Sequence, residues 1–88
     1  MHAPEVGMFW RSLADACAML DERQEAERHY LKALSLGVDD AYANARYGVF
    51  LKAQGEREKA RAYLRRALDL DPNLKQAREV LGELDDVQ

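Results

Sequence analysis

Residues 22–36 read ERQEAERHYLKALSL, and residues 56–70 read EREKARAYLRRALDL. Set side by side, the two stretches agree at six places: Glu22 and Glu56, Arg23 and Arg57, Ala26 and Ala60, Ala33 and Ala67, Leu34 and Leu68, and Leu36 and Leu70. The spacing is 34 residues throughout. Leu13, Tyr47 and Leu81 fall at the same spacing, which indicates a partial third copy. A period of this length is typical of a helical array, in which each copy is one supersecondary unit.

The composition favours helices over strands. Of the 88 residues, 47 are Ala, Leu, Arg, Glu or Lys, while Val occurs five times and Ile and Thr are absent. The first five residue types are strong helix formers, whereas sheets depend on β-branched residues. The sequence therefore predicts an all-α fold in one small domain.

Turn residues divide the copies into helices. Gly37-Val38-Asp39-Asp40 and Asp71-Pro72-Asn73 close the two copies, because Gly ends a helix and Pro prevents its continuation. Within the copies, Gly55 is suited to the left-handed conformation that ends a helix. We expect its equivalent, Asp21, to cap the next helix instead, with Gln24 completing a capping box. Five helices are predicted, at 7–20, 22–36, 41–54, 56–70 and 74–85.

These residues resemble the tetratricopeptide repeat, whose pattern is W-x2-L-G-x2-Y, then A-x3-F, then P. The matching positions are Trp10, Leu13, Ala14, Cys17, Ala26, Tyr30 and Val38 in the first copy, and Asn44, Tyr47, Gly48, Leu51, Ala60, Leu64 and Pro72 in the second. Val38 stands where the family has Pro, and Asn44 stands where it has Trp. The third copy keeps Leu81 and Gly82 and looks like a lone capping helix.

The resemblance implies a right-handed α-solenoid of antiparallel helix pairs. It assigns residues 7–40 to the first repeat, 41–74 to the second and 75–88 to a capping helix and tail, after a flexible N-terminus at 1–6. It also implies a non-catalytic role in which a groove holds a peptide or helix of a partner protein. The subgroup that clamps acidic chaperone tails is disfavoured, since Asp15, Gln76 and Val80 stand at positions where cations or Asn are expected.

The face of each first helix that points away from its partner helix would line the groove. We predict that it binds the partner through Met8, Arg11, Ser12, Asp15, Tyr42, Arg46 and Val49. Their mixed apolar and cationic character suits a peptide with an acidic residue, for which Arg46 is a fork-shaped anchor and Tyr42 a flat contact. The same face also carries Phe9, Phe50 and Met19. In the alternative interpretation, these three residues do not line the groove but pack between adjacent repeats.

Helix 7–20 carries more apolar surface than one partner helix can cover. A free-standing array needs polar outer faces at its ends, and helix 74–85 has one while helix 7–20 does not. We therefore expect Phe9, Trp10 and Met19 to form an oligomer interface. Their partner is either a second copy, which gives a homodimer, or upstream repeats of a longer scaffold whose C-terminal end this segment forms. In this alternative the function is assembly.

Other functions find little support in the residues. A formal charge of −3 argues against nucleic acid and anionic membranes as partners. His2 and His29 have no second ligand at metal-binding spacing, and Cys17 lies on a core stripe without a base nearby. We expect no catalytic residue, no metal, no cofactor and no small-molecule substrate. The single Cys17 fits a reducing compartment, so we expect a cytoplasmic protein.

Overall fold

The chain is described by a computed structural model that covers residues 4–37 and 40–86, with side chains described for 8–37 and 40–85. Within these ranges it contains five helices and no strand, as predicted: α1 (Pro4–Met19), α2 (Arg23–Leu36), α3 (Asp40–Ala53), α4 (Arg57–Leu70) and α5 (Lys75–Asp86). Helix α1 begins at Pro4 rather than at 7, so residues 4–6 of the segment expected to be flexible are helical. Residues 1–3 lie outside the described part.

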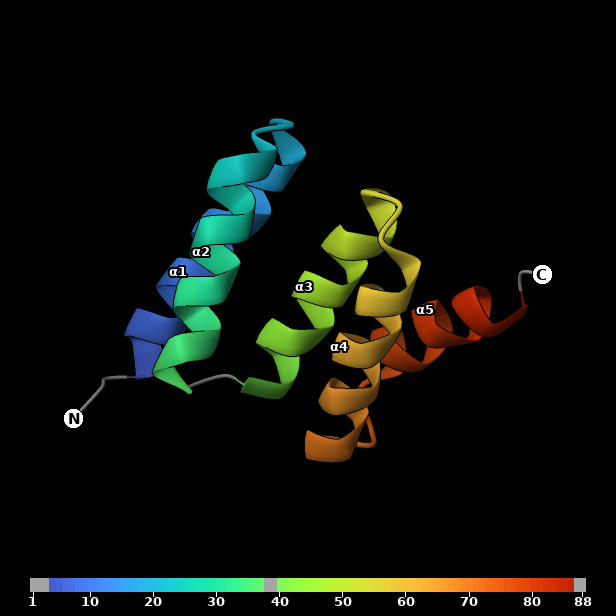
Figure 1. Cartoon of the computed structure of the whole chain (residues 1–88). Helices are drawn as coiled ribbons and strands as arrows, with labels where there is room; N and C mark the ends of the chain where they lie inside the picture. The colour runs from blue at the N-terminus through green and yellow to red at the C-terminus, as the bar shows by residue number, and fades with distance from the viewer. Residues whose placement is uncertain (1–3, 38–39, 87–88) are drawn as a thin grey trace.

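The helices form two antiparallel hairpins, α1 with α2 and α3 with α4, and α5 packs against the second (Figure 1). Small residues allow the helices of each hairpin to approach closely. Ala14 and Ala26 are fully buried in the first hairpin, and Gly48 of the second lies against Leu64. The arrangement is an all-α solenoid of antiparallel helix pairs, which confirms the predicted fold class.

The turns inside the two hairpins have the same geometry, although one uses Asp and the other Gly. Asp21 has a φ of 62° and Gly55 a φ of 84°, so both take the left-handed conformation. Each is followed by a Glu whose backbone N–H donates to a carbonyl five residues earlier, Glu22 to Cys17 at 2.8 Å and Glu56 to Leu51 at 3.0 Å. The expectation that Asp21 caps α2 was wrong. Glu22 holds the N-cap position and makes no side-chain cap.

An aromatic cluster joins the two hairpins. The ring of Tyr30 on α2 lies 5.6 Å from that of Tyr47 and 5.5 Å from that of Phe50, both on α3. All three side chains are buried, and the Tyr47 hydroxyl donates to Glu27 of α2 at 2.6 Å. Phe50 therefore packs between repeats, as the alternative interpretation expected, whereas Phe9 and Met19, which it placed there too, are 58% and 87% exposed.

The last helix is held by side chains of the second hairpin. Arg57 and Arg61 of α4 both donate to the Leu84 carbonyl, at 3.1 and 3.3 Å. Since the last carbonyls of a helix lack partners within the helix, these bonds stabilise the end of α5.

No helix in the described ranges is both long enough and apolar enough to cross a membrane.

Candidate functional site

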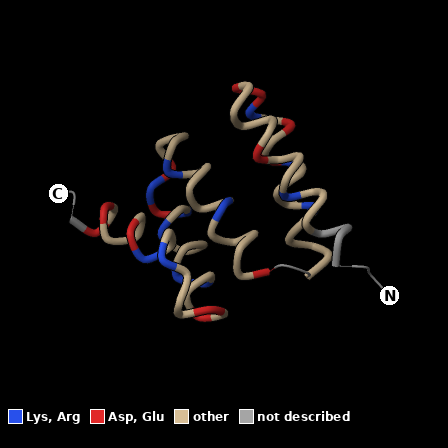
Figure 2. Tube along the Cα trace, turned by 180° about the vertical axis from the view of Figure 1, so that it is seen from behind, with Lys and Arg blue, Asp and Glu red and all other residues tan. Residues whose placement is uncertain are grey.

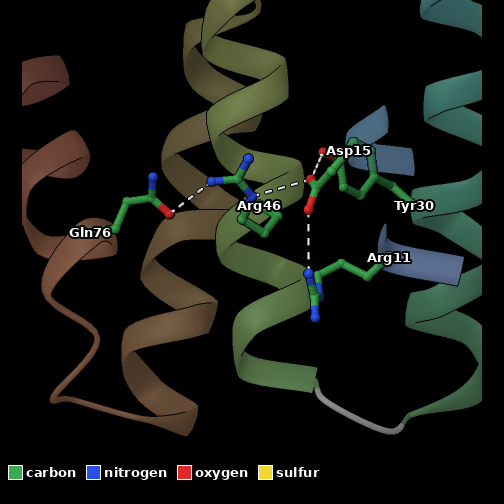
Figure 3. A network of polar contacts seen from close by, with 5 residues as sticks. All are labelled: Arg11, Asp15, Tyr30, Arg46 and Gln76. Carbon is green, nitrogen blue, oxygen red and sulfur yellow. Dashed lines mark hydrogen bonds and ion pairs between the residues drawn. The ribbon is translucent and has the colours of Figure 1, made fainter. Parts of the chain in front are cut away.

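Three helices that are not consecutive in the chain share one face of the molecule. Asp15 of α1, Arg46 of α3 and Gln76 of α5 are linked across this face in a chain of polar contacts (Figure 3). The Arg46 Nε donates to Asp15 Oδ1 at 3.2 Å, and a terminal nitrogen of Arg46 donates to Gln76 Oε1 at 3.2 Å. We call this surface the α1–α3–α5 face.

Asp15 is the centre of the network. Besides Arg46, it accepts a hydrogen bond from the Tyr30 hydroxyl of α2 and one from Arg11 of α1, the latter at 3.3 Å. Its side chain is 21% exposed and that of Arg46 is 27% exposed, so the pair is shielded more than an ordinary surface ion pair. One carboxylate thus connects both hairpins.

The surroundings shift the pKa of two members of this network. Burial raises the pKa of Tyr30 well above its usual range, and the hydrogen bond to the charged Asp15 raises it further. Burial by itself lowers the pKa of Arg46, but the Asp15 carboxylate outweighs that effect, so the pKa is raised. Tyr30 is therefore a neutral donor and Arg46 a permanent cation.

Arg11 connects the network to an aromatic ring of the second repeat. Its guanidinium carbon lies 4.5 Å from the centre of the Tyr42 ring, and its side chain is only 13% exposed. An arginine over a ring at this distance is attracted by the ring's electrons. The structure thus brings together Arg11, Asp15, Tyr42 and Arg46, four of the seven residues predicted to bind a partner.

A hollow of about 190 Å³ lies next to the Asp15–Arg46 pair. Its walls come from α1, α2 and α3 and the turn that follows α3, and are mostly apolar: Asp15, Ala18, Met19, Tyr30, Arg46, Val49, Phe50, Ala53 and Gln54. Val49, the fifth predicted contact, lines this hollow. Met8 and Ser12 lie elsewhere, exposed on α1.

Sequence reasoning missed several residues of this face. Tyr30 was identified only as a position of the repeat pattern, yet its hydroxyl belongs to the network. A buried tyrosine needs a partner for its hydroxyl, and that requirement was the available signal. Gln76 was considered only as a missing cation, although it accepts a bond from Arg46.

The residues predicted to form an oligomer interface separate into two groups. Phe9 is 58% exposed and Met19 is 87% exposed, so both present apolar surface to solvent. Trp10 instead faces the partner helix α2, with its ring 5.4 Å from that of His29.

Within the residues described, no group of three His, Cys, Asp or Glu side chains is arranged to hold a metal ion.

The fold and this face define a class of protein, a short α-solenoid built from helical hairpins. The chain belongs to the family described as YpiA-like, C-terminal tetratricopeptide repeats, whose family model matches residues 8–73. No curated protein matches the chain significantly, and neither does any solved structure. Repeats of this type are generally non-catalytic modules that mediate interactions between proteins.

Proposed function

We propose that the chain binds a peptide or helix of a partner protein along the α1–α3–α5 face. The observation that supports this is the apolar hollow beside a shielded charged network, on the surface that three first helices share. An apolar side chain of the partner fills the hollow, and its neighbouring residues lie over the network. The role is non-catalytic.

The size of the hollow fits a side chain better than a whole ligand. Pockets for small molecules usually measure roughly 300–1,000 Å³, whereas this one measures about 190 Å³. Of the lining residues, Phe50 is 7% exposed and held in the core, while Met19 is 87% exposed. A fixed wall and a flexible methionine together can adapt to anchors of different shape.

The network suggests the charge of the partner. Arg11 and Arg46 carry two positive charges and Asp15 one negative charge, so the three together leave one positive charge. An acidic residue next to the apolar anchor would complement it. Arg46 is already paired with Asp15. We therefore expect the acidic residue of the partner to add selectivity more than affinity.

Selection from a displayed library of random peptides tests the proposal. The chain and two variants, Ala53→Glu and Ala62→Glu, are used as targets. Both alanines are exposed, but Ala53 lines the hollow and Ala62 lies on α4. We expect selected peptides to share an apolar residue followed or preceded by an acidic one.

Fluorescence anisotropy with the selected peptides supplies the comparison of affinities. Ala53→Glu places a charge in the hollow and is expected to weaken binding at least about tenfold, or 1.4 kcal/mol. Ala62→Glu is expected to leave the affinity unchanged. Peptides that bind the Ala53→Glu variant as tightly as the original chain would show that the hollow is not the site.

A further inference from the structure

The outer side of α1, with Leu20 directly after its last residue, is an apolar surface that none of the described residues covers. Met8, Phe9, Met19 and Leu20 are 46%, 58%, 87% and 70% exposed. Ser12 and Ala16 lie between them and are exposed as well. We call these six residues the α1 outer face.

At two of these six positions, those of Phe9 and Ala16, the repeat register shows that the corresponding residues of α3 and α5 are buried. Phe9 is equivalent to Ala43 and to Ala77, which are both 0% exposed. Ala16 is equivalent to Phe50 and Leu84, which are 7% and 0% exposed. Phe50 packs against Tyr30 of the preceding hairpin, with the ring centres 5.5 Å apart. The α1 outer face is therefore built like a packing surface.

We propose that the α1 outer face pairs with the same face of a second copy of this chain, in an antiparallel, two-fold arrangement. Of the six residues only Met19 also lines the hollow, so the proposal does not depend on the proposed peptide site. Three observations support it: the order of side-chain sizes along the face, the absence of charge from the face, and the exposed charges of α5 at the opposite end of the molecule.

The sizes follow a palindrome. Two large residues, Met8 and Phe9, are followed by the small Ser12 and Ala16 and then by the large Met19 and Leu20. In an antiparallel pair centred near position 14, Met8 would meet Leu20, Phe9 would meet Met19, and Ser12 would meet Ala16. Small residues at the middle allow two helix axes to approach closely, and large residues at the ends cover each other. A two-fold interface requires this kind of self-complementarity.

The charge distribution favours pairing of like faces. None of the six residues is charged, so two copies of the face meet without repulsion. Over residues 8–19 of α1 only Arg11 and Asp15 are charged, whereas charged residues are frequent on α4 and α5 (Figure 2). A head-to-tail contact would place this apolar face against the exposed charges of α5, such as Lys75, Arg78 and Glu79. That contact would remove charges from water without partners.

Sedimentation equilibrium over a hundredfold range of concentration, up to about 1 mM, tests the pairing. A single helix face is smaller than the roughly 800 Å² per partner of a typical stable interface, so we expect a reversible dimer. The double variant Phe9→Glu, Leu20→Glu is expected to be monomeric throughout, with at least about a hundredfold loss of association. Because both residues are already exposed, its circular dichroism is expected to match that of the original chain.

A matched control carries the same change at apolar residues outside the face. Leu31 and Leu70 are 46% and 50% exposed, on α2 and α4. The double variant Leu31→Glu, Leu70→Glu is expected to dimerise like the original chain. The proposal would be overturned if the original chain were a monomer at every concentration. It would also be overturned if the Phe9→Glu, Leu20→Glu variant still formed the dimer. Peptide binding by that variant would be unchanged, so the two proposals fail separately.

Disulfide cross-linking tests the antiparallel orientation. In a Cys17→Ala background, the variants Ser12→Cys and Ala16→Cys are oxidised alone and as a mixture. The proposed pairing brings position 12 of one copy to position 16 of the other, so the mixture is expected to cross-link faster than either variant alone. Faster cross-linking of each variant with itself would overturn the arrangement.

Discussion

The first and second hairpins share a repeat but differ in what covers them. On α3, Ala43, Tyr47 and Phe50 are 0%, 2% and 7% exposed, and the last two pack against Tyr30 of the first hairpin. On α1, the equivalent of Ala43 is Phe9, which is 58% exposed. The exposed residue is the larger and more apolar of the two. Burial at this register therefore depends on the neighbouring hairpin, and α1 carries the side chains without the neighbour.

The interior of the two hairpins differs as well. At the helix crossing, the first hairpin has Ala14 and the second has Gly48. A Cβ atom built on Gly48 would lie 2.7 Å from Leu64 Cγ and 3.3 Å from the Ala60 carbonyl oxygen. The second hairpin is therefore the more tightly crossed, and it has no room for a side chain at this point.

The largest effect is expected from filling that crossing. In Gly48→Val the new side chain is forced against Cγ of Leu64. This leucine is fully buried and cannot move aside freely. Overpacking of a core costs about 1–3 kcal/mol, and we expect the upper end of that range in the free energy of unfolding. Urea unfolding followed by circular dichroism gives the value.

Gly82→Val is the control for the Gly48 substitution. Gly82 stands 34 residues later, and a Cβ built there meets no atom within 4 Å. Replacing a helical glycine in open space changes stability by less than about 0.5 kcal/mol, with a small gain expected from helix propensity. Equal losses at the two positions would mean that the tight crossing is not what distinguishes them.

A smaller effect is expected where the two hairpins are joined. Asp15→Ala removes the acceptor shared by Arg46 and the buried Tyr30, and leaves both without this partner. Loss of one partner from a shielded polar network costs about 2 kcal/mol in the free energy of unfolding. The same urea titration measures it.

Glu25→Ala provides the comparison for Asp15. Glu25 pairs with Arg28 on the outside of α2, where the two side chains are 47% and 73% exposed. An exposed pair of this kind contributes little, so we expect a change within about 0.5 kcal/mol. If both variants lost the same stability, the network would contribute no more than an ordinary surface pair.

The fold could be predicted from the sequence because its signals are local. A 34-residue period, turn residues such as Gly55 and Pro72, and apolar positions at helical spacing each involve neighbours along the chain. The turn at Asp21 was misread because Asp both caps helices and tolerates the left-handed conformation. Local rules alone could not choose between these two roles.

The site was less predictable because its geometry depends on how the hairpins stack. Arg46 lies 31 residues from Asp15 and 30 residues from Gln76, yet it contacts both. The repeat register places Asp15 and Arg46 on the first helices of successive repeats, so both were expected on one surface. Their pairing with each other was not foreseen, because it depends on the distance between α1 and α3 rather than on either helix alone.

The smallest effect is expected at the position that distinguishes the start of each repeat. The ring of Trp10 in the first repeat lies against that of His29, but the equivalent of Trp10 in the second repeat is Asn44. Asn44 is 1% exposed, and its Nδ2 donates to the Asp40 carbonyl at 2.8 Å. Its Oδ1 is buried and has no hydrogen-bond partner.

Asn44→Leu is therefore expected to raise the free energy of unfolding by about 1 kcal/mol, because it removes an unpaired buried oxygen and adds apolar contact. A hollow of about 260 Å³ borders this position and is lined in part by Leu31, Leu34 and Tyr63, so the branched side chain has room. Asn44→Ala is the control, since it removes the same oxygen without the apolar contact, and we expect it to be less stable than the leucine variant. A leucine variant less stable than the original chain would show that the bonds to Asp40 outweigh the unpaired oxygen.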